Sequence, residues 1–574
     1  MSNQTLLATG KSSGTNFNQT LNGQPFFVAG NWDLVESNGI SVYLPKGATA
    51  DERKRAEEIA ALANSAKTFV SGLVGNFPDA PLKIVAVRRG AGYSDSGMIL
   101  LDYGVFRRPK IDSQTVLRIT ESIAKTYFGN AAQVRGEGFG VIREGLSRYI
   151  ATQFIEKQFG KEAADIERLR QRTAYSAVSR RDAPLNLVSP ADDFYFAAVA
   201  NKGAMIWRML AKAIGEQQLF NTVRNQMQSG NLTLATLRRE VSSQKAFLDY
   251  AFDQATDMNL LAGLPQTSGG ETKVALRNLG SIAATVNVVA TTDRGEKLTA
   301  QVTIPAKNFG EAVFRNPSKI VRVEVDPEKF YPQLDFSDDI APRDFNESDA
   351  ILVIKRAFDK KDYPAAEKNA RAALQATPNF DEARMWLGRA LLAQGKNQEA
   401  EREFRSVLDV KLPAAQSVAW ATVGLGEIAL KANQPIQAAN FFNDAIKAEA
   451  ESAAVFNARA GRNISKVAPV IDESLRAFFQ QFDKAATSGR KADMDALIMA
   501  GEMPRFSGGI GGQAQQWQTT LLQIDRLDEN SVLAEVSLNI KMLNKDPESG
   551  TAIFQLSKVG NVWKLSGVEM FEVR

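Results

Sequence analysis

Alternating and helical hydrophobic patterns divide the chain into regions of different secondary structure. Segments of alternating polarity predict strands at 26–29, 32–35, 40–44, 82–87 and 98–101. A capping box at Thr49–Glu52 predicts a long helix between these two groups of strands. Residues 1–24 are rich in Asn, Ser, Thr and Gly, and we expect them to be flexible or loosely strand-forming. Helical periodicity then continues to about residue 259.

From about residue 272 the hydrophobic period changes to two. Strands are predicted at 274–276, 284–290, 298–304 and 320–325, which together suit a small antiparallel β-sandwich. Residues 326–347 contain Pro327, Pro332, Pro342 and many acidic residues, and this composition predicts a linker.

A repeat occupies residues 348–450. Its equivalent positions are Ala366, Ala400 and Ala438, preceded by Ile354, Gly388 and Gly426 and followed by Ala370, Phe404, Phe442, Ala373, Val407 and Ala445. The first two units lie 34 residues apart, a spacing that is similar to tetratricopeptide repeats, in which paired helices cross at small residues. Such arrays bind partner proteins on a concave surface, although a structural spacer is an equal alternative. The polar candidates for that surface are Asn369, Arg371, Arg389, Arg402 and Lys431.

The C-terminal region combines a helical pattern with a run of long strands. Leu475–Phe482 has helical periodicity, and strands are predicted at 518–524, 531–540, 551–558 and 562–570. This order resembles the nuclear-transport-factor/ketosteroid-isomerase-like α+β cone, a fold with a pocket and many functions. The intervening Gly508–Gly512 run is expected to be a mobile loop.

Composition narrows the possible chemistry. The chain has no histidine and no cysteine, which excludes Ser-His-Asp and Cys-His triads and every metal site that uses these ligands. The net charge is +4 and the basic residues are interleaved with acids, so we expect no nucleic-acid partner. No stretch approaches the ~20 apolar residues of a transmembrane segment, and no secretory signal is visible.

Two motifs carry a family resemblance. Tyr127–Asn130 matches the Trp-Phe-Gly-Asn tail of a zinc-binding helix, and Arg143–Gly145 followed by Tyr149 matches Asn-Glu-Gly-x-x-x-Tyr. Glu144 lies 19 residues after Lys125, as the third ligand follows the second in that pattern. Residues 20–340 therefore resemble the gluzincin family of membrane alanyl aminopeptidases, which join a thermolysin-like catalytic domain to a small β-sandwich. Only the last strands of that family's N-terminal β domain have a counterpart here.

The resemblance implies a zinc site whose ligands have been replaced. The family's two histidines and glutamate correspond to Glu121, Lys125 and Glu144, and its catalytic glutamate corresponds to Ser122. Zinc is the cofactor of the family, but this set of side chains would not bind it.

The remaining catalytic positions of the family are also replaced. The glutamate that recognises the substrate amine corresponds to Ser94, and the transition-state tyrosine corresponds to Ala200. Tyr195 is five residues too early for that role. The resemblance thus implies a non-peptidase.

We expect Lys125 to bridge Glu121 and Glu144 in place of zinc. The alternatives are an exposed i,i+4 pair between Glu121 and Lys125, a calcium site at the two glutamates, or a Ser122–Lys125 catalytic dyad. The glycine-rich segment 135–140 follows a helix and not a strand, so we expect an inter-helix loop and no phosphate site.

The sequence therefore predicts a multidomain α+β protein. Its expected parts are a remnant β segment (1–45), a thermolysin-like, mostly helical domain (46–268), a β-sandwich (269–340), a tetratricopeptide α-solenoid (346–462) and an α+β cone (463–574). The first functional hypothesis is a catalytically inactive aminopeptidase-like scaffold that binds a protein partner through its repeats. The alternative is an active zinc aminopeptidase-type hydrolase, and a third possibility is a small-molecule pocket in the cone. By analogy with bacterial proteins of this kind, we expect an envelope or secreted location after signal removal, with a cytoplasmic location as the alternative.

Overall fold

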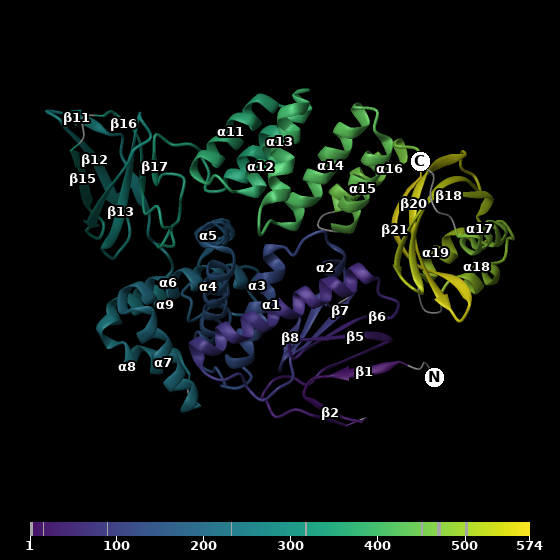
Figure 1. The fold of residues 1–574 in the computed structure, drawn as a ribbon, viewed down its shortest axis with the longest axis horizontal. Helices are drawn as coiled ribbons and strands as arrows, with labels where there is room; N and C mark the ends of the chain where they lie inside the picture. The colour runs from purple at the N-terminus through teal and green to yellow at the C-terminus, as the bar shows by residue number, and fades with distance from the viewer. Residues whose placement is uncertain are drawn as a thin grey trace.

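The computed structural model describes residues 4–14, 16–88, 90–230, 232–315, 318–448, 452–467, 472–499 and 503–573. Four parts follow one another along the chain (Figure 1). The repeat helices arch over an N-terminal body, with the β-sandwich at one end of the arch and the C-terminal domain at the other. No described helix is both long and apolar enough to cross a membrane.

The N-terminal body contains a mixed five-stranded sheet. Its order is β5 (Trp32–Ser37), β6 (Ile40–Pro45), β7 (Lys83–Val87), β9 (Met98–Asp102) and β8 (Ser94–Asp95), with β6, β7 and β9 parallel. The predicted strands and capping box are confirmed: helix α1 (Ala50–Val74) begins after Thr49, whose hydroxyl accepts from Glu52 N. Before this sheet, β1 (Thr5–Ala8) pairs with β4 (Phe27–Gly30) and β2 (Lys11–Ser13) with β3 (Asn16–Asn18).

Helices complete the body. They are α2 (Gly104–Arg107), α3 (Ser113–Tyr127), α4 (Ser147–Phe159), α5 (Lys161–Ser176), α6 (Gly203–Ile214), α7 (Glu216–Gln228), α8 (Leu234–Glu240), α9 (Lys245–Asp253) and the short 3-10 turns η2 (Ser179–Arg181) and η4 (Ser242–Gln244). Two π-helical segments, η1 (Val141–Leu146) and η3 (Ala197–Lys202), were not predicted. The apolar side chains that recur along α3 at helical spacing are buried: Val116, Ile119, Ile123 and Tyr127.

The β-sandwich packs two four-stranded sheets on one apolar core. One sheet contains β10 (Leu260–Ala262), β11 (Gln266–Ser268), β12 (Glu271–Asn278) and β15 (Phe309–Arg315). The other contains β13 (Ala284–Thr292), β14 (Lys297–Ile304), β16 (Ile320–Val325) and β17 (Ile340–Ala341). The four predicted strands are confirmed, and burial alternates along β12 and β13 because only one face of each sheet meets the core.

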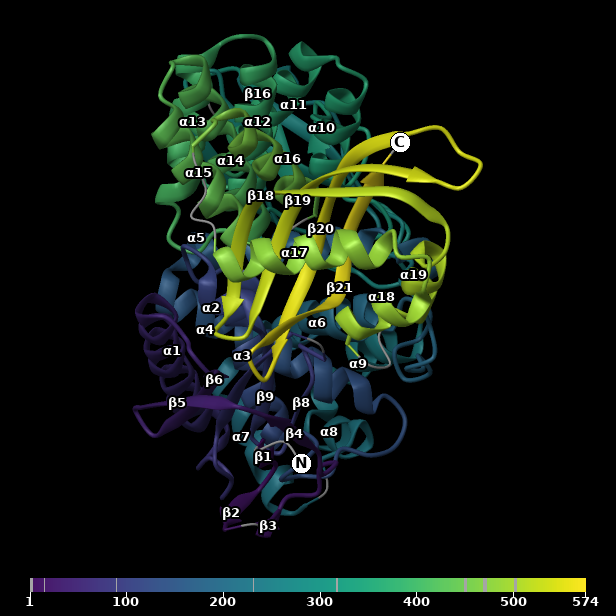
Figure 2. The same ribbon diagram turned by 90° about the vertical axis from the view of Figure 1, so that its right-hand side faces the viewer.

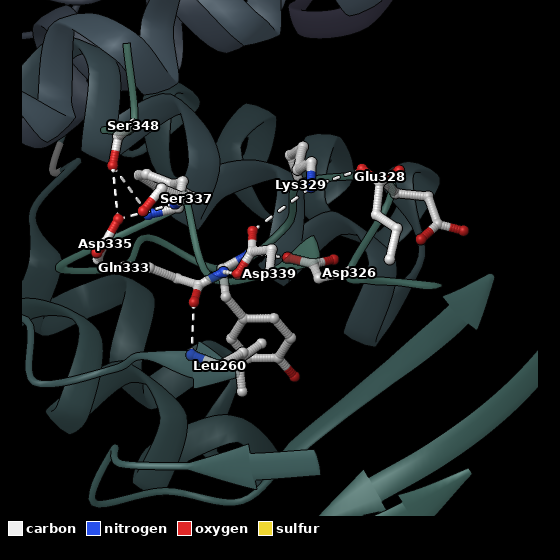
Figure 3. A network of polar contacts seen from close by, with 12 residues as sticks. Leu260, Asp326, Glu328, Lys329, Gln333, Asp335, Ser337, Asp339 and Ser348 are labelled. Carbon is white, nitrogen blue, oxygen red and sulfur yellow. Dashed lines mark hydrogen bonds and ion pairs between the residues drawn. The ribbon is translucent and has the colours of Figure 1, made fainter. Parts of the chain in front are cut away.

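Residues 326–348 form a packed strap, so the prediction of a linker is wrong. Gln333 and Asp339 are fully buried within it. Gln333 Nε2 donates to Asp339 Oδ1 at 3.0 Å, and Gln333 Oε1 accepts from Leu260 N at 2.6 Å (Figure 3). Proline and aspartate suit linkers, but here the carboxylates accept hydrogen bonds from the strap and its neighbours.

Two further contacts hold the strap together. Ser348 Oγ, at the end of the strap, donates to Asp335 Oδ1 at 3.1 Å. Lys329 Nζ lies 2.9 Å from Glu324 Oε1 and 3.4 Å from Asp339 Oδ2. Burial is the main cause that raises the pKa of Asp339 to about 8, against the lowering effect of the Lys329 charge.

The repeat region consists of antiparallel helix pairs. Its helices are α10 (Ala350–Asp359), α11 (Tyr363–Ala376), α12 (Asp381–Ala393), α13 (Asn397–Asp409), α14 (Ala415–Lys431), α15 (Pro435–Ala448) and α16 (Ser452–Ile464). The predicted repeat positions are buried. A Cβ on Gly388 or Gly424 would lie 2.5 or 2.2 Å from the Phe404 ring, so glycine lets that ring fill the space between helices. Gly426 and Gly461 flank Phe442 in the same way.

The C-terminal domain is a curved antiparallel meander crossed by a helix. The strands β18 (Ala514–Asp528), β19 (Ser531–Met542), β20 (Glu548–Val559) and β21 (Val562–Val573) pair in chain order. Helix α17 (Glu473–Ala486) runs across the sheet (Figure 2), and α18 (Lys491–Leu497) and α19 (Pro504–Ile510) follow it. The prediction of a loop at Gly508–Gly512 is wrong for its first three residues, which end α19, a short helix that begins at a proline.

Buried ion pairs join the parts. Arg170 of α5 lies 2.8 Å from Asp381 and 2.9 Å from Glu382 at the start of α12. At the other end of the array, Arg462 of α16 lies 2.7 Å from Asp525 of β18 and 3.2 Å from Glu535 of β19. Each arginine donates to two carboxylates through several N–H groups. These contacts fix the relative orientation of the two domains that they join.

Candidate functional site

The two π-helical segments position the residues that correspond to the zinc site. A Cβ on Gly145 of η1 would lie 2.7 Å from Val199 O and 3.1 Å from Gly203 Cα, so only glycine permits this close packing of η1 on η3 and α6. Glu144 therefore projects from a wide turn of helix beside α3. Such wide turns are frequent at functional sites.

Lys125 and Glu144 form the first of two ion pairs between α3 and η1–α4. Lys125 Nζ lies 2.5 Å from Glu144 Oε2, with side chains that are 20% and 9% exposed. Arg143 Nη1 lies 4.0 Å from the other oxygen of Glu144. One half of the predicted lysine bridge is thus present.

The other half is wrong, because Glu121 pairs with Arg148. Arg148 Nε donates to Glu121 Oε1 at 2.6 Å, and its Nη1 donates to Asn201 Oδ1. Burial favours the neutral form of Arg148, but the charge and hydrogen bond of Glu121 outweigh it and raise the Arg148 pKa. Among the described residues, Glu121 and Lys125 form no ion pair, so the exposed i,i+4 alternative also fails. The sequence signal that could have identified Arg148 is its position one helical turn after Glu144.

Tyr195 lies closer to this network than its position in the sequence suggests. Its side chain is buried beside Gly140, where a Cβ would lie 2.5 Å from the tyrosine hydroxyl. Burial is the main cause that raises the pKa of Tyr195 to about 12; the Glu144 charge raises it further and Arg143 lowers it. Ala200, the aligned position, is buried in η3. The fold therefore brings Tyr195 near Glu144, although the spacing in the sequence argued against a shared site.

Ser122 and Ser94, which correspond to two catalytic residues of the family, lie in a helix and a strand. Ser122 is buried on α3, and its carbonyl accepts from Thr126 Oγ1 at 3.1 Å. Ser94 opens the short strand β8, opposite Ile99. Because Lys125 Nζ is held by Glu144, the geometry gives Ser122 no free lysine as a base.

The side chains at the three ligand positions do not fit zinc. Lys125 places an ammonium, which cannot ligate a metal, against the Glu144 carboxylate. Glu121 is occupied by Arg148. The described residues contain no group of three or more His, Cys, Asp or Glu side chains that could hold a metal ion. The two ion pairs hold α3 against η1 and α4 by charge.

The second candidate site is a groove on the repeat array. A cavity of about 300 Å³ opens between α10, α12, α14 and α16. Its lining residues are Phe358, Arg389, Leu392, Ala393, Phe404, Trp420, Val423, Gly424, Glu427, Lys431 and Asn457. Most of these side chains are apolar, with a few polar groups among them, as in ligand-binding pockets.

Aromatic rings hold Arg389 at the groove. Its guanidinium lies 3.7 Å from the centroid of the Trp420 ring, 4.3 Å from Trp386 and 4.8 Å from Phe358. Cation–π contacts of this kind immobilise the charge. Burial is the main cause that raises the pKa of Glu427, against the lowering effects of Lys431 and Arg389.

Two of the five predicted polar candidates line the groove and three do not. Arg389 and Lys431 are lining residues. Asn369 and Arg371 lie on α11 and Arg402 on α13, and Arg371 pairs with Glu367 at 2.8 Å. Glu427 was missed; it lies four residues before Lys431, on the same face of α14.

The model of the family described as "Tetratricopeptide repeat" matches residues 357–419. No curated protein matches the sequence. Solved structures of leukotriene A4 hydrolase are among the structural neighbours, at low identity. The yeast enzyme with bestatin is 12% identical, with a TM-score of 0.40 over 80% of this chain and 72% of that chain. Native yeast enzyme gives 10% identity and a TM-score of 0.41 over 80% and 73% of the two chains, and a native structure from Saccharomyces cerevisiae gives 11% and 0.39 over 81% and 72%. These scores are too low to establish a common fold.

Proposed function

We propose that this protein is a catalytically inactive, aminopeptidase-like scaffold that binds a protein partner through its tetratricopeptide repeats. The observation that carries the proposal is the ion pair between Lys125 and Glu144. At the positions where the resemblance implies zinc ligands, a lysine neutralises the remaining carboxylate. The repeat match at residues 357–419 supports protein interaction.

The domain contacts suit a scaffold. Arg170 and Arg462 anchor the two ends of the repeat array to the body and to the C-terminal domain through buried carboxylates. A repeat array that is anchored at both ends has less freedom to rearrange, and a partner that binds it then loses less ordering entropy.

Metal content and activity test the absence of catalysis. We expect less than about 0.1 zinc per chain after incubation with zinc and dialysis, because an ammonium occupies a ligand position. We also expect no release of product from aminoacyl-anilide substrates above that of a Ser122→Ala variant. The control is Glu121→His with Lys125→His, which restores a three-ligand set with Glu144 and should raise zinc binding. Stoichiometric zinc in the unmodified protein together with hydrolysis would overturn the proposal in favour of the peptidase alternative.

Cross-linking in the native source tests the scaffold. We expect a partner protein whose cross-links fall on α10, α12, α14 and α16. Cross-links confined to other parts of the protein would reject the repeats as the binding site.

A further inference from the structure

A small cavity lies where the strap meets the helices of the N-terminal body. Its volume of about 10 Å³ leaves room for one water molecule or one monatomic ion. Tyr149 of α4, Arg168 of α5, Arg208 of α6 and Lys329 of the strap line it. Within the described part of the chain, no Asp or Glu borders this space. Its wall therefore carries three positive charges and no negative one.

Arg208 has no ion-pair partner among the residues that the structure describes. Its Nη1 donates to the main-chain carbonyl of Glu328 at 2.6 Å, and its guanidinium lies 4.1 Å from the centroid of the Phe330 ring. Burial is the main cause that lowers the pKa of Arg208 to about 10, and the charge of Arg168 lowers it further. A partly buried cation beside a second cation is destabilised, and a bound anion would relieve this repulsion.

Arg168 has two carboxylate partners but keeps a free donor. Its Nη atoms contact Glu156 and Asp165, whose side chains are 36% and 38% exposed. Water screens such exposed carboxylates, so they compensate the arginine charge only in part. The Nε of Arg168 is buried and has no hydrogen-bond partner among the described residues. Buried N–H groups are normally satisfied by an acceptor, and this one is available to a ligand in the cavity.

Lys329 is compensated less than its two contacts suggest. Glu324 Oε1 lies 2.9 Å from the lysine Nζ, but Arg322 contacts the other oxygen of the same carboxylate at 2.8 Å. Asp339 lies 3.4 Å from Nζ and keeps its proton at neutral pH, because burial raises its pKa to about 8. An ammonium has three N–H groups, so one of them remains for a ligand.

The hydroxyl of Tyr149 completes a set of donors. It accepts from Gln153 Nε2 at 2.8 Å, so the phenol proton is available to an acceptor. The three cations can only donate hydrogen bonds. A water molecule would therefore use only its acceptor capacity here and would leave the charges uncompensated. A monatomic anion accepts from every side and supplies the missing negative charge.

We propose that this cavity binds one monatomic anion, a halide such as chloride, between Arg168, Arg208 and Lys329. The anion also accepts from the Tyr149 hydroxyl. Because Lys329 belongs to the strap and the two arginines belong to α5 and α6, the bound anion ties the strap to the body. Neither zinc content nor a partner protein enters the test below, so anion binding stands or fails apart from the proposed function.

Hydrogen exchange of the full-length protein in chloride tests the proposal. Chloride replaces gluconate, which is far too large for the cavity, at a constant ionic strength of about 0.3 M so that screening does not change. Amide exchange in the strap and in α6 should slow by about threefold or more and should saturate, as expected for one site. Bromide should act like chloride. Equal protection by chloride, gluconate and sulfate would show a general effect of ions and overturn the proposal.

Matched variants assign the effect to the cavity. Arg208→Gln should abolish the response of the strap to chloride. Tyr149→Phe keeps the ring and removes one donor, so the chloride concentration for half-maximal protection should rise by about threefold to tenfold. The control is Lys212→Met, because the exposed Lys212 lies 3.9 Å from the centroid of the same Phe330 ring and does not line the cavity. Its response to chloride should equal that of the unmodified protein.

The two cavity variants keep the test decisive. If Arg208→Gln loses the docked strap altogether, Tyr149→Phe still reports on the site, since it changes no charge and no contact with the strap. A chloride response that is unchanged in Tyr149→Phe, or abolished in Lys212→Met, would place the anion elsewhere and overturn the proposal. Broadening of the chloride-35 resonance by the unmodified protein, reversed by bromide and not by gluconate, is the expected direct sign of binding. No broadening would also overturn it.

Discussion

The Lys125 ammonium lies 2.5 Å from the Glu144 carboxylate, between α3 and η1. This contact occurs where the family resemblance implies a metal between the same two elements. A second ion pair joins the same two parts of the fold: Arg148 Nε of α4 lies 2.6 Å from Glu121 Oε1 of α3. Each carboxylate has its own cation, which explains how two acidic side chains are accommodated in a largely buried region.

Removing one member of the first pair tests its contribution to stability. Lys125→Met should lower the free energy of unfolding by about 2–4 kcal/mol, because it leaves Glu144 charged, nearly buried and without its nearest cation. Adding Glu144→Gln should recover about half of this loss, since the unpaired charge disappears. Urea unfolding measures the change, with hydrogen exchange of α3 assigning the transition to the body. A loss below about 0.5 kcal/mol would show that the pair behaves as an exposed one.

The fully buried Asp339 of the strap should make stability depend on pH. Its pKa is raised to about 8 in the folded protein from an ordinary value of 3.8. The folded state therefore keeps a proton that the unfolded state has lost. Its stabilising contribution is complete below about pH 4 and falls as pH rises toward 8, by up to about 1.4 kcal/mol per pH unit.

An uncharged variant isolates this effect. Asp339→Asn retains an oxygen that can accept from Gln333 Nε2 and carries no titratable group. The difference between its unfolding free energy and that of the unmodified protein should grow from pH 5 to pH 8. The carboxylate of Glu324 does not contribute in this window, because its pKa is lowered to about 2. Parallel pH profiles for the two proteins would contradict the raised pKa.

Two helical glycines should respond in opposite directions to the same substitution. In Gly424→Ala the new Cβ would lie 2.2 Å from the Phe404 ring, so overpacking should cost about 1–3 kcal/mol. In Gly72→Ala, on an exposed turn of α1, the Cβ meets nothing within 4 Å. The better helix propensity of alanine should then stabilise by about 0.5–1 kcal/mol. Unfolding measurements on both variants check the sign, and equal effects would refute the packing of Phe404.

The contact between body and repeats depends on Arg170. Arg170→Met would leave the fully buried Asp381 and the neighbouring Glu382 without their cation, and should cost about 3–5 kcal/mol. Proteolysis should then become faster at the start of α12. The matched control is Arg371→Met, which removes an exposed i,i+4 pair with Glu367 and should cost less than about 1 kcal/mol. Unchanged protection of α12 in Arg170→Met would show that other contacts suffice for docking.

Local patterns predicted the elements well because their causes are local. The capping box at Thr49 needs only four consecutive residues, and the repeat at Ala366, Ala400 and Ala438 needs only small residues at regular spacing. The alternation along β12 and β13 likewise follows from one buried face. Tertiary context overruled local signals in the strap, where proline and aspartate proved compatible with burial once distant groups supplied hydrogen bonds.

For the candidate site too, the sequence predicted the location, and the tertiary structure decided the contacts. Sequence alignment with a family motif identified Glu121, Lys125 and Glu144 as one location, but it assigned both carboxylates to the lysine. Arg148 was missed because it stands at an unspecified position of the motif, between Gly145 and Tyr149, so the motif assigns it no role. Tyr195 was set aside on spacing, although the fold places it near Glu144.

The sequence alone determined the helices, the strands, the repeat period and the absence of histidine and cysteine chemistry, since each follows from nearby residues or from composition. The tertiary structure decided which cation meets which carboxylate, that residues 326–348 are buried, and that Arg389, Trp420 and Glu427 border one cavity. Those facts depend on distances between residues far apart in the chain. Such distances are fixed by the packing of whole elements, at Gly145 against Gly203 and at Gly424 against Phe404, and no local pattern encodes them.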